Sequence, residues 1–351
     1  MSDARLFEAL DLFRRKRRLG YIQVGASSQC TLGCVMCPRT RFPDAWSSAD
    51  MPPETYERIA RSFPDARNVY LSGWGEPLLN AHFLDMVGSA KEAGCTVGFT
   101  TNGERLDEGA MRGLVELGAD LTGVSLAGAA PGTHGSRRRG SDLNGVFSRI
   151  ARLNAIKEEA GSDKPRVLLF FMMLKDNMEE LLDCVERAAG LGADGVVATN
   201  LDYVGDQAQD GLKAFSCGAP TEGLAEKVSE AGGLAERLGV YFRAFPFEMS
   251  RVRVCSEDPI NNLYVSEGGD VYPCVYLGLP MVRIPRIFCG SRTVLPRVSF
   301  GNVNERSLLD IWEDEAYASF RGRYEARLKE NDPDPSSLPE VCRTCYKAYG
   351  V

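Results

Sequence analysis

The sequence has little histidine and no long apolar segment. Its 351 residues include only two histidines, His82 and His134, so chemistry that depends on histidine has few candidates. The longest uninterrupted apolar run, Val167–Leu174, has eight residues, far fewer than the ~20 that span a membrane. The first twenty residues carry charges where a secretory signal needs an apolar stretch. We therefore expect a cytoplasmic protein with no membrane partner.

The chain also lacks an excess of positive charge. Its 41 lysines and arginines are outnumbered by 48 aspartates and glutamates, which gives a net charge of −7. This balance argues against a nucleic-acid partner, because the molecule as a whole does not attract phosphate backbones. Hydrophobic residues make up 44% of the chain, as in globular proteins with a sizeable core. At ~150 residues per domain, the length indicates two domains.

Cysteine, in contrast, is abundant. There are 11 cysteines, an odd number in a chain without an export signal, so we expect reduced thiols rather than a disulfide framework. Several are clustered: three lie between residues 30 and 37, and two more lie within ten residues of the end. Such grouping indicates a chemical role for the thiols.

Short apolar runs alternate with helical patterns along the first 250 residues. The runs begin at Tyr21, Asn68, Thr96, Leu121, Val167 and Gly195, with a seventh candidate at Val240. Alternation of this kind predicts a parallel sheet with right-handed crossovers. Because the count falls short of the eight strands of a closed barrel, we predict an α/β fold with a partial (β/α)6 TIM-like barrel, open on one side.

The character of the sequence changes near residue 250. The alternation stops, five cysteines follow, and proline and arginine become frequent. We therefore predict three regions: an N-terminal helical segment at 1–19, the partial barrel at 20–249 and a C-terminal domain at 250–351.

The front cysteines, Cys30, Cys34 and Cys37, form the pattern CTLGCVMC directly after the first predicted strand. Loops that follow strands form the active face of a barrel. Three thiolates on one loop can hold a metal and leave a coordination position open, which is typical of sites that act on a ligand. Thiolates favour an iron–sulfur cluster or zinc over magnesium or calcium.

On these residues the chain resembles the radical SAM superfamily. The resemblance implies that the three cysteines hold a [4Fe–4S] cluster whose open iron binds S-adenosylmethionine. Reductive cleavage of that cofactor would give methionine and a 5′-deoxyadenosyl radical, which abstracts hydrogen from the substrate. A flavodoxin- or ferredoxin-type electron donor is implied as well. A structural zinc site is the alternative.

Further motifs extend the resemblance, each at the end of its own predicted strand. The turn SGWGEPLLN at 72–80 stands where the family has a Gly-Gly-Glu-Pro-like motif, with Trp74 in place of a glycine. Glycine there lets the backbone approach the ammonium group of the cofactor. Ser125 and the arginines at 137–139 match the family pattern that binds the carboxylate or ribose of the cofactor. Ala127 stands where relatives often have aspartate. The resemblance predicts cofactor contacts from Gly73, Trp74, Gly75, Glu76, Pro77, Asn102, Ser125, Arg138 and Arg139, with the choice among Arg137, Arg138 and Arg139 left open.

A second group of cysteines lies in the C-terminal region. The segment from Cys255 to Cys274 reads as a β-hairpin with Gly268 and Gly269 at its turn and a cysteine at each end. Near the end of the chain, the motif CRTC at 342–345 is a tight chelating pair. Brought together, the two pairs would form a closed four-thiolate site for an iron–sulfur cluster or a structural zinc ion.

This region resembles the auxiliary-cluster domain of the SPASM/twitch radical SAM subfamily. The cysteine spacing, the phrase FGNV at 300–303 and the following Trp312 and Arg321 carry the resemblance. The chain stops six residues after the last cysteine, which favours the shortened twitch form. The resemblance then implies one auxiliary [4Fe–4S] cluster on Cys255, Cys274, Cys342 and Cys345.

Other candidate catalytic residues are Cys217, Cys289 and His134. The two cysteines lie in predicted loops, where a thiol could return hydrogen to a substrate radical or act as an extra ligand. His134 follows the fourth predicted strand, near the expected active face. Cys95 and Cys184 are expected in the core.

The resemblance leaves the second half of the reaction open. The best-matched precedent is deoxy-scyllo-inosamine dehydrogenase, so we favour oxidation of a small polar alcohol, with the auxiliary cluster as electron acceptor. Peptide modification by thioether or carbon–carbon crosslinking is the alternative. Only about 20 residues precede the first predicted strand, few for a separate leader-binding domain. Epimerisation and a non-enzymatic iron–sulfur electron carrier are further alternatives.

Overall fold

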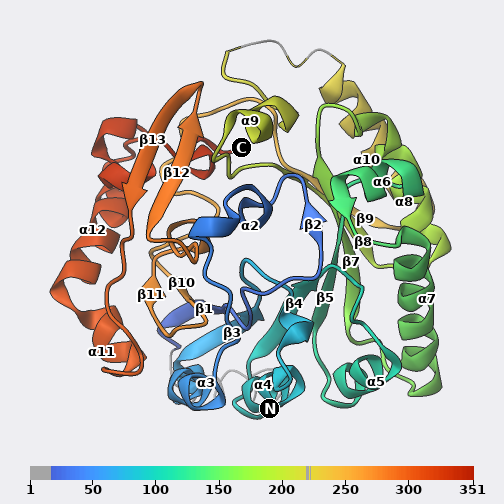
Figure 1. Cartoon of the computed structure of the whole chain (residues 1–351), viewed down its shortest axis with the longest axis horizontal. Coiled ribbons are helices and arrows are strands. Elements are labelled where there is room, and N and C mark those ends of the chain that lie inside the picture. Colours follow the sequence, from blue (N-terminus) through green and yellow to red (C-terminus); the bar gives the residue numbers. More distant parts are fainter. Residues whose placement is uncertain (1–16, 219–220, 222) are drawn as a thin grey trace, which may run out of the picture.

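The computed structural model describes residues 17–218, 221 and 223–351. The N-terminal segment expected at 1–19 therefore lies almost entirely outside the described residues. Within the described part, nine strands form one sheet in the order β11-β10-β1-β3-β4-β5-β7-β8-β9. The sheet curves around the centre of the molecule, and helices cover its outer side (Figure 1).

The elements have the following bounds. The large sheet contains β1 (Leu19–Val24), β3 (Ala66–Leu71), β4 (Thr96–Thr101), β5 (Leu121–Leu126), β7 (Arg166–Met173), β8 (Gly195–Asn200), β9 (Tyr241–Ala244), β10 (Leu263–Val265) and β11 (Val271–Tyr272). The helices are α2 (Pro38–Arg41), α3 (Pro53–Ala60), α4 (Phe83–Glu92), α5 (Glu108–Glu116), α6 (Pro131–Arg137), α7 (Leu143–Glu159), α8 (Leu181–Gly190), α9 (Gln207–Leu212), α10 (Leu224–Leu238), α11 (Leu308–Glu313) and α12 (Glu315–Lys329). Two small ladders pair β2 (Gly33–Cys34) with β6 (Arg138–Arg139), and β12 (Arg283–Phe288) with β13 (Ser291–Pro296).

The predicted partial barrel is confirmed. All seven predicted strands are present as β1, β3, β4, β5, β7, β8 and β9, and each neighbouring pair is parallel. Helices follow each of the first six strands, which gives the expected alternation. Because the carboxyl ends of parallel strands lie at one edge, the loops that follow them meet there.

Strand β7 shows how the sequence divides core from cavity. Its side chains alternate, so Val167, Leu169 and Phe171 are fully buried against the outer helices. The intervening Phe170 and Met172 lie on the other face and line the central cavity. One face of this continuous apolar run therefore packs against the outer helices, and the other lines the central cavity.

Helix α8 covers one part of the outer face. Its buried residues Leu181, Cys184, Val185 and Ala188 recur at helical spacing and form one apolar stripe. Cys184 is fully buried there, as predicted, and Cys95 is likewise buried in the core.

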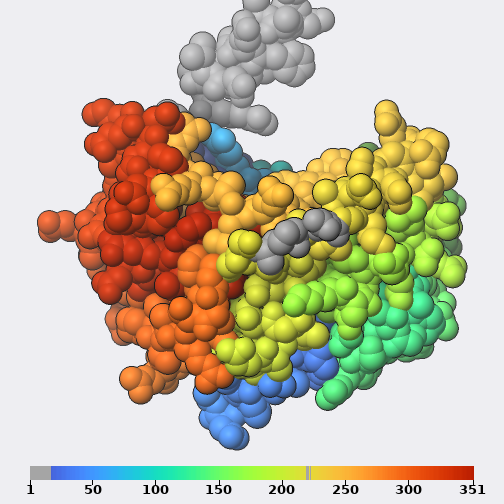
Figure 2. Space-filling model, turned by 90° about the horizontal axis from the view of Figure 1, so that it is seen from above, coloured from blue at the N-terminus to red at the C-terminus, as the bar shows by residue number. Residues whose placement is uncertain are grey.

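The large sheet continues across residue 250. The predicted hairpin is present, since β10 and β11 pair antiparallel and Gly269 adopts a positive φ of 87° at the turn. Strand β10 also pairs in parallel with β1, with Ile22 opposite Leu263 and Val24 opposite Val265. Figure 2 shows the C-terminal segments packed closely beside the segments around 210–250. The division at 249/250 stays a prediction, but the regions on its two sides share a sheet.

None of the helices in the described ranges combines the length and the hydropathy that crossing a lipid bilayer demands.

Candidate active site

A large cavity, here called the front cavity, opens at the carboxyl ends of the parallel strands. It contains about 1350 Å³ of empty space, part of it open to solvent. Residues that follow β1, β3, β4, β5 and β8 line it, together with inward-facing residues of β7. This position is the one at which barrels of this type place their chemistry.

Cys30, Cys34 and Cys37 lie together on one wall of the front cavity. Cys34 belongs to β2, whose pairing with β6 places Arg138 directly opposite. The Cys37 N–H donates to the Cys34 carbonyl at 3.1 Å, which folds the loop tightly before α2. Burial raises the pKa of Cys34, against a lowering influence from Arg138, and burial raises the pKa of Cys37 to about 11. Bound iron would supply the positive charge that favours their thiolate forms.

The glycine-rich turn after β3 packs against the loop that carries Cys30. A Cβ atom on Gly75 would lie 2.4 Å from the carbonyl oxygens of both Ser27 and Gln29, so only glycine fits. The next residue, Glu76, donates its N–H to the Gln29 carbonyl at 2.7 Å. The turn and the cysteine loop thus form one continuous wall, along which backbone groups are accessible to a ligand.

Glu76 joins this turn to the end of β4. Its buried carboxylate accepts hydrogen bonds from the Thr101 hydroxyl and from the Asn102 N–H, both at 2.7 Å. Burial raises the pKa of Glu76, and these hydrogen bonds oppose the rise. The Asn102 amide in turn donates to Cys30 Sγ at 3.6 Å. Glu76 therefore orders the wall on which the cysteines lie.

The structure distinguishes the three neighbouring arginines. Arg138 lines the front cavity beside Ser125, and its Nε is buried without a hydrogen-bond partner. The Nε of Arg137 is likewise without a partner, but Arg137 pairs with Asp176 and does not line the cavity, and the exposed Arg139 does not line it either. An unpartnered guanidinium nitrogen beside the cavity fits an anionic group of a ligand, such as a carboxylate.

Of the other residues in the predicted cofactor site, Gly73, Trp74, Gly75, Glu76 and Asn102 also line the cavity. Pro77 does not, because it is buried at the start of a short 3-10 turn. The residues present therefore fit S-adenosylmethionine: a thiol triad, a glycine-rich wall and an unpartnered arginine face the same space.

Cys217 and Cys289 are not free thiols, contrary to the sequence-based expectation of reduced cysteines. They form a disulfide that joins the loop after α9 to the turn between β12 and β13. Their positions differ by 72 residues, so local sequence patterns could not reveal the pairing. A disulfide sulfur carries no hydrogen, which argues against the predicted role as hydrogen donor.

His134 also departs from its predicted place at the active face. The side chain is completely buried under the loop after β5, and its Nε2 lies 3.0 Å from the Ser141 hydroxyl. Burial, with a contribution from Arg138, lowers the pKa of His134 to about 4, so the ring is neutral at pH 7. It does not line the front cavity, and its contacts are those of a core residue.

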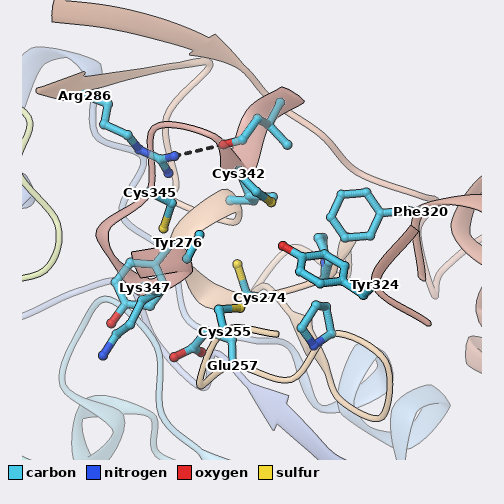
Figure 3. Close-up of a pocket in the computed structure, with 15 residues that line it drawn as sticks. Cys255, Glu257, Cys274, Tyr276, Arg286, Phe320, Tyr324, Cys342, Cys345 and Lys347 are labelled. Atoms are coloured by element: carbon cyan, nitrogen blue, oxygen red, sulfur yellow. Dashed lines mark hydrogen bonds between the residues drawn. The ribbon is translucent and has the colours of Figure 1, made fainter. Parts of the chain in front are cut away.

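The four cysteines of the C-terminal region surround a second, smaller space, here called the rear cavity (Figure 3). It contains about 380 Å³ of empty space. Cys255 precedes β10 and Cys274 follows β11, so the hairpin brings this pair together, as predicted. Cys342 ends the 3-10 turn Glu340–Cys342, and Cys345 directly precedes the 3-10 turn Tyr346–Tyr349.

Cys342 is buried, and the other three rear cysteines are partly buried. Burial raises the pKa of Cys255 and of Cys274 well above the ordinary value, and that of Cys342 to about 12. Among the described residues, no group of three or more histidine, cysteine, aspartate or glutamate side chains is arranged to hold a single metal ion. Four thiols around one enclosed space fit a four-iron cluster, which takes one cysteine at each iron.

A common wall separates the two cavities. Tyr276 and Lys347 line both of them, and Asp202 lines the front one. The Lys347 ammonium lies 2.6 Å from the Asp202 carboxylate, and the Tyr276 hydroxyl donates to the same carboxylate at 3.0 Å. Trp74 of the glycine-rich turn donates its indole N–H to the Val275 carbonyl at 2.8 Å. The front motif and the rear cysteine loops are thus in direct contact.

Sequence reasoning missed Asp202, Tyr276 and Lys347. One signal was available for Asp202, which directly follows the predicted strand that begins at Gly195 and therefore falls at the active face. The other two lie two residues after Cys274 and Cys345, with no pattern that marks them as cavity residues.

Comparison with known proteins agrees with this geometry. Residues 26–188 match the model of the radical SAM superfamily, and residues 255–346 match that of the SPASM iron–sulfur cluster-binding domain. The cofactor-modifying protein for tungsten-containing aldehyde ferredoxin oxidoreductase from Pyrococcus furiosus is 31% identical over 310 residues, which cover 86% of this chain and 83% of that protein. A PqqA peptide cyclase from Rhizobium meliloti is 22% identical over 332 residues, 91% of this chain and 77% of its own length.

Among solved structures, Streptococcus suis SuiB bound to S-adenosylmethionine has the same fold. It superposes with a TM-score of 0.66 at 17% identity, and the match covers 91% of this chain and 72% of SuiB. The enzyme anSMEcpe with bound AdoMet gives a TM-score of 0.58 at 15% identity, with 93% of this chain and 84% of that one covered.

Proposed function

We propose that this chain, which belongs to the radical SAM superfamily and carries a SPASM iron–sulfur cluster-binding domain, modifies a peptide by radical chemistry. When bound, S-adenosylmethionine and the iron–sulfur clusters supply a 5′-deoxyadenosyl radical and the means to move single electrons. A flavodoxin- or ferredoxin-type protein is the proposed electron donor, and the cytoplasm the proposed location.

The residues of the front cavity have distinct tasks in this proposal. Cys30, Cys34 and Cys37 hold the cluster that binds the cofactor. Gly75 lets the glycine-rich turn pack directly on the loop that carries Cys30, and backbone groups of this turn bind the ammonium group of the cofactor. Arg138 binds an anionic group of the cofactor through its unpartnered nitrogen. Cys255, Cys274, Cys342 and Cys345 hold the auxiliary cluster behind the common wall.

The likeness to PqqA peptide cyclases along 91% of the chain carries the choice of a peptide. The front cavity is also open to solvent on one side. An opening to solvent lets one side chain of a peptide enter while the remainder stays outside.

Modification of a cofactor is the second candidate. The Pyrococcus furiosus relative, which is named for modifying a cofactor, is the more similar in sequence at 31% identity. Dehydrogenation of a small alcohol, favoured from the sequence, is not the reaction for which either relative described above is named.

The first test measures cofactor cleavage. Anaerobically reconstituted protein with dithionite is expected to convert S-adenosylmethionine to 5′-deoxyadenosine. Alanine at Cys30, Cys34 and Cys37 should abolish this product, whereas alanine at Cys342 and Cys345 should leave it measurable. The matched control is Cys95→Ala, which alters a free core cysteine outside both cavities. Undiminished cleavage by the front variant would contradict the assignment of the triad.

The second test identifies the substrate class. The protein is incubated with an extract of source cells grown in deuterated medium, and deuterium in 5′-deoxyadenosine is measured by mass spectrometry. Transfer that disappears after protease treatment of the extract supports a peptide. Transfer that survives protease treatment supports a cofactor or another small molecule and overturns the peptide proposal.

A further inference from the structure

The common wall of the two cavities contains a buried ion pair. One carboxylate oxygen of Asp202 accepts hydrogen bonds from both the Lys347 ammonium and the Tyr276 hydroxyl, at 2.6 and 3.0 Å. The side chains of Asp202 and Lys347 are only 13% and 8% exposed. Solvent therefore screens these charges weakly, and their influence extends further than that of a surface pair.

The pair connects the barrel to the rear cysteine loops. Asp202 follows β8, whereas Tyr276 and Lys347 lie in the 3-10 turns Val275–Leu277 and Tyr346–Tyr349, directly after Cys274 and Cys345. A single carboxylate from the barrel thus holds the turns that follow two of the four rear cysteines. Figure 3 shows Lys347 and Tyr276 beside these cysteines.

Only one member of the pair reaches the rear cavity. Lys347 lines both cavities and lies with the four cysteines around the rear one, whereas Asp202 lines only the front cavity. The other charged residues around the rear cavity are Glu257 and Arg286, and Arg286 donates to the Val341 carbonyl at 3.0 Å. On its far side the Lys347 ammonium lies over the Phe245 ring, 4.4 Å from the centroid. Asp202 thus neutralises Lys347 by direct contact, and the Glu257 carboxylate adds a smaller negative influence on it.

The front cavity presents a second acceptor beside Asp202. Asn200, at the end of β8, is 2% exposed, and its amide donates to the Pro246 carbonyl at 2.8 Å. Its Oδ1 is buried without a partner, and the residue lines the front cavity. Two neighbouring acceptors fit a substrate group that donates hydrogen bonds, such as a hydroxyl, an ammonium or a peptide N–H.

We propose that the ion pair of Asp202 and Lys347 links substrate binding to the rear cluster. Asp202, with Asn200, binds a hydrogen-bond-donating group of the substrate, and Lys347 sets the reduction potential of the cluster. A positive charge near a cluster favours its more negative, reduced form and raises the potential. When a substrate group donates a hydrogen bond to the Asp202 carboxylate, this carboxylate neutralises the positive charge of Lys347 less fully. Substrate binding therefore raises the reduction potential of the cluster and makes it a better electron acceptor. The proposal rests on the cluster assigned to the rear cysteines.

The test of the electrostatic link needs no substrate. The rear cluster is studied alone in a parent chain with alanine at Cys30, Cys34 and Cys37, and its reduction potential is measured by titration followed with electron paramagnetic resonance. Asp202→Asn is expected to raise the potential and Lys347→Met to lower it. The double variant should return close to the parent, because both charges are then absent.

The matched control is Asp210→Asn, which breaks an ion pair of the same length, 2.6 Å, between Asp210 and Lys213, outside both cavities. Iron and sulfide content of each variant reports whether the cluster assembles. An unchanged potential in Asp202→Asn with full iron content, or a shift as large in Asp210→Asn, overturns the link. Absence of iron from the parent chain would instead contradict the rear-cluster assignment in the proposed function.

The substrate contact is tested with the deuterated extract and the chain that retains both cysteine groups. Asp202→Asn and Asn200→Leu should each lower the fraction of 5′-deoxyadenosine that carries deuterium by about tenfold, as expected for loss of a hydrogen bond to a charged or buried group. Asp210→Asn should leave that fraction as it is. An unaltered deuterium fraction in both cavity variants overturns the substrate contact.

Discussion

At the residue scale, Gly75 places the tightest restriction on the front cavity. Its Cα faces two carbonyl oxygens of the loop before Cys30, with no room for a methyl group. The restriction comes from backbone atoms, which side-chain rearrangement cannot relieve. Any larger residue must therefore push the glycine-rich turn away from the cysteine loop.

We predict that Gly75→Ala lowers the free energy of unfolding by about 1–3 kcal/mol and weakens binding of S-adenosylmethionine. Urea unfolding and equilibrium dialysis with labelled cofactor measure the two effects. Gly132→Ala is the matched control, because a Cβ there meets no atom within 4 Å and the residue lies in α6. Stability and affinity equal to those of the parent in Gly75→Ala would contradict the close contact.

The residue scale also shows what sequence can predict about the site. Cys30, Cys34 and Cys37 could be assigned because one short loop carries all three, and their spacing is itself the signal. Asp202 and Lys347 could not be assigned in that way. Their contact exists only because the end of the chain folds back onto the loop after β8, and no local pattern encodes such a contact.

At the element scale, Asp120 holds several elements of the barrel together. It directly precedes β5, accepts a hydrogen bond from the Val97 N–H of β4 at 2.9 Å, and pairs with Lys91 of α4 and with Lys164. Burial raises the pKa of Asp120, but the hydrogen bonds from Lys164, Lys91 and Val97 outweigh it, and the pKa is lowered. The folded state therefore holds the proton less tightly than the unfolded state does.

It follows that the stabilising contribution of Asp120 is present above the pKa of an unfolded aspartate, about 3.9, and is lost as pH falls through the lower folded value. Asp120→Asn should reduce the free energy of unfolding by about 1–2 kcal/mol at pH 7 and flatten its decline in acid. Urea unfolding at a series of pH values measures both effects. The exposed Asp44→Asn is the control, and an equally steep acid decline in Asp120→Asn would sink the prediction.

The sequence predicts some strands of the sheet but not all of their pairings. The seven parallel strands followed from apolar runs, and β10 and β11 from a glycine turn between such runs. The pairing of β10 with β1 could not be predicted, because register between strands far apart in sequence depends on the tertiary fold. The short ladder between β2 and β6, two residues in each strand, is too brief for any periodic pattern.

At the scale of the whole molecule, the disulfide between Cys217 and Cys289 closes a loop of 72 residues. We predict that peptide mapping without reductant finds the two cysteines linked. The variant Cys217→Ala/Cys289→Ala should lose about 2–4 kcal/mol of unfolding free energy, since a crosslink restricts the unfolded chain. Each single variant should lose about as much as the double. Alkylation of both thiols in native protein without reductant would contradict the bond.

The shared sheet has a consequence for dissecting the molecule. A fragment that ended at residue 249 would lack β10 and so leave one edge of β1 without its partner at Ile22–Val24, and an exposed sheet edge of this kind favours aggregation. The last hundred residues thus complete the sheet beside β1, besides carrying the four rear cysteines. The surroundings of each iron centre therefore include residues from the other half of the chain. We expect that neither half folds and functions alone.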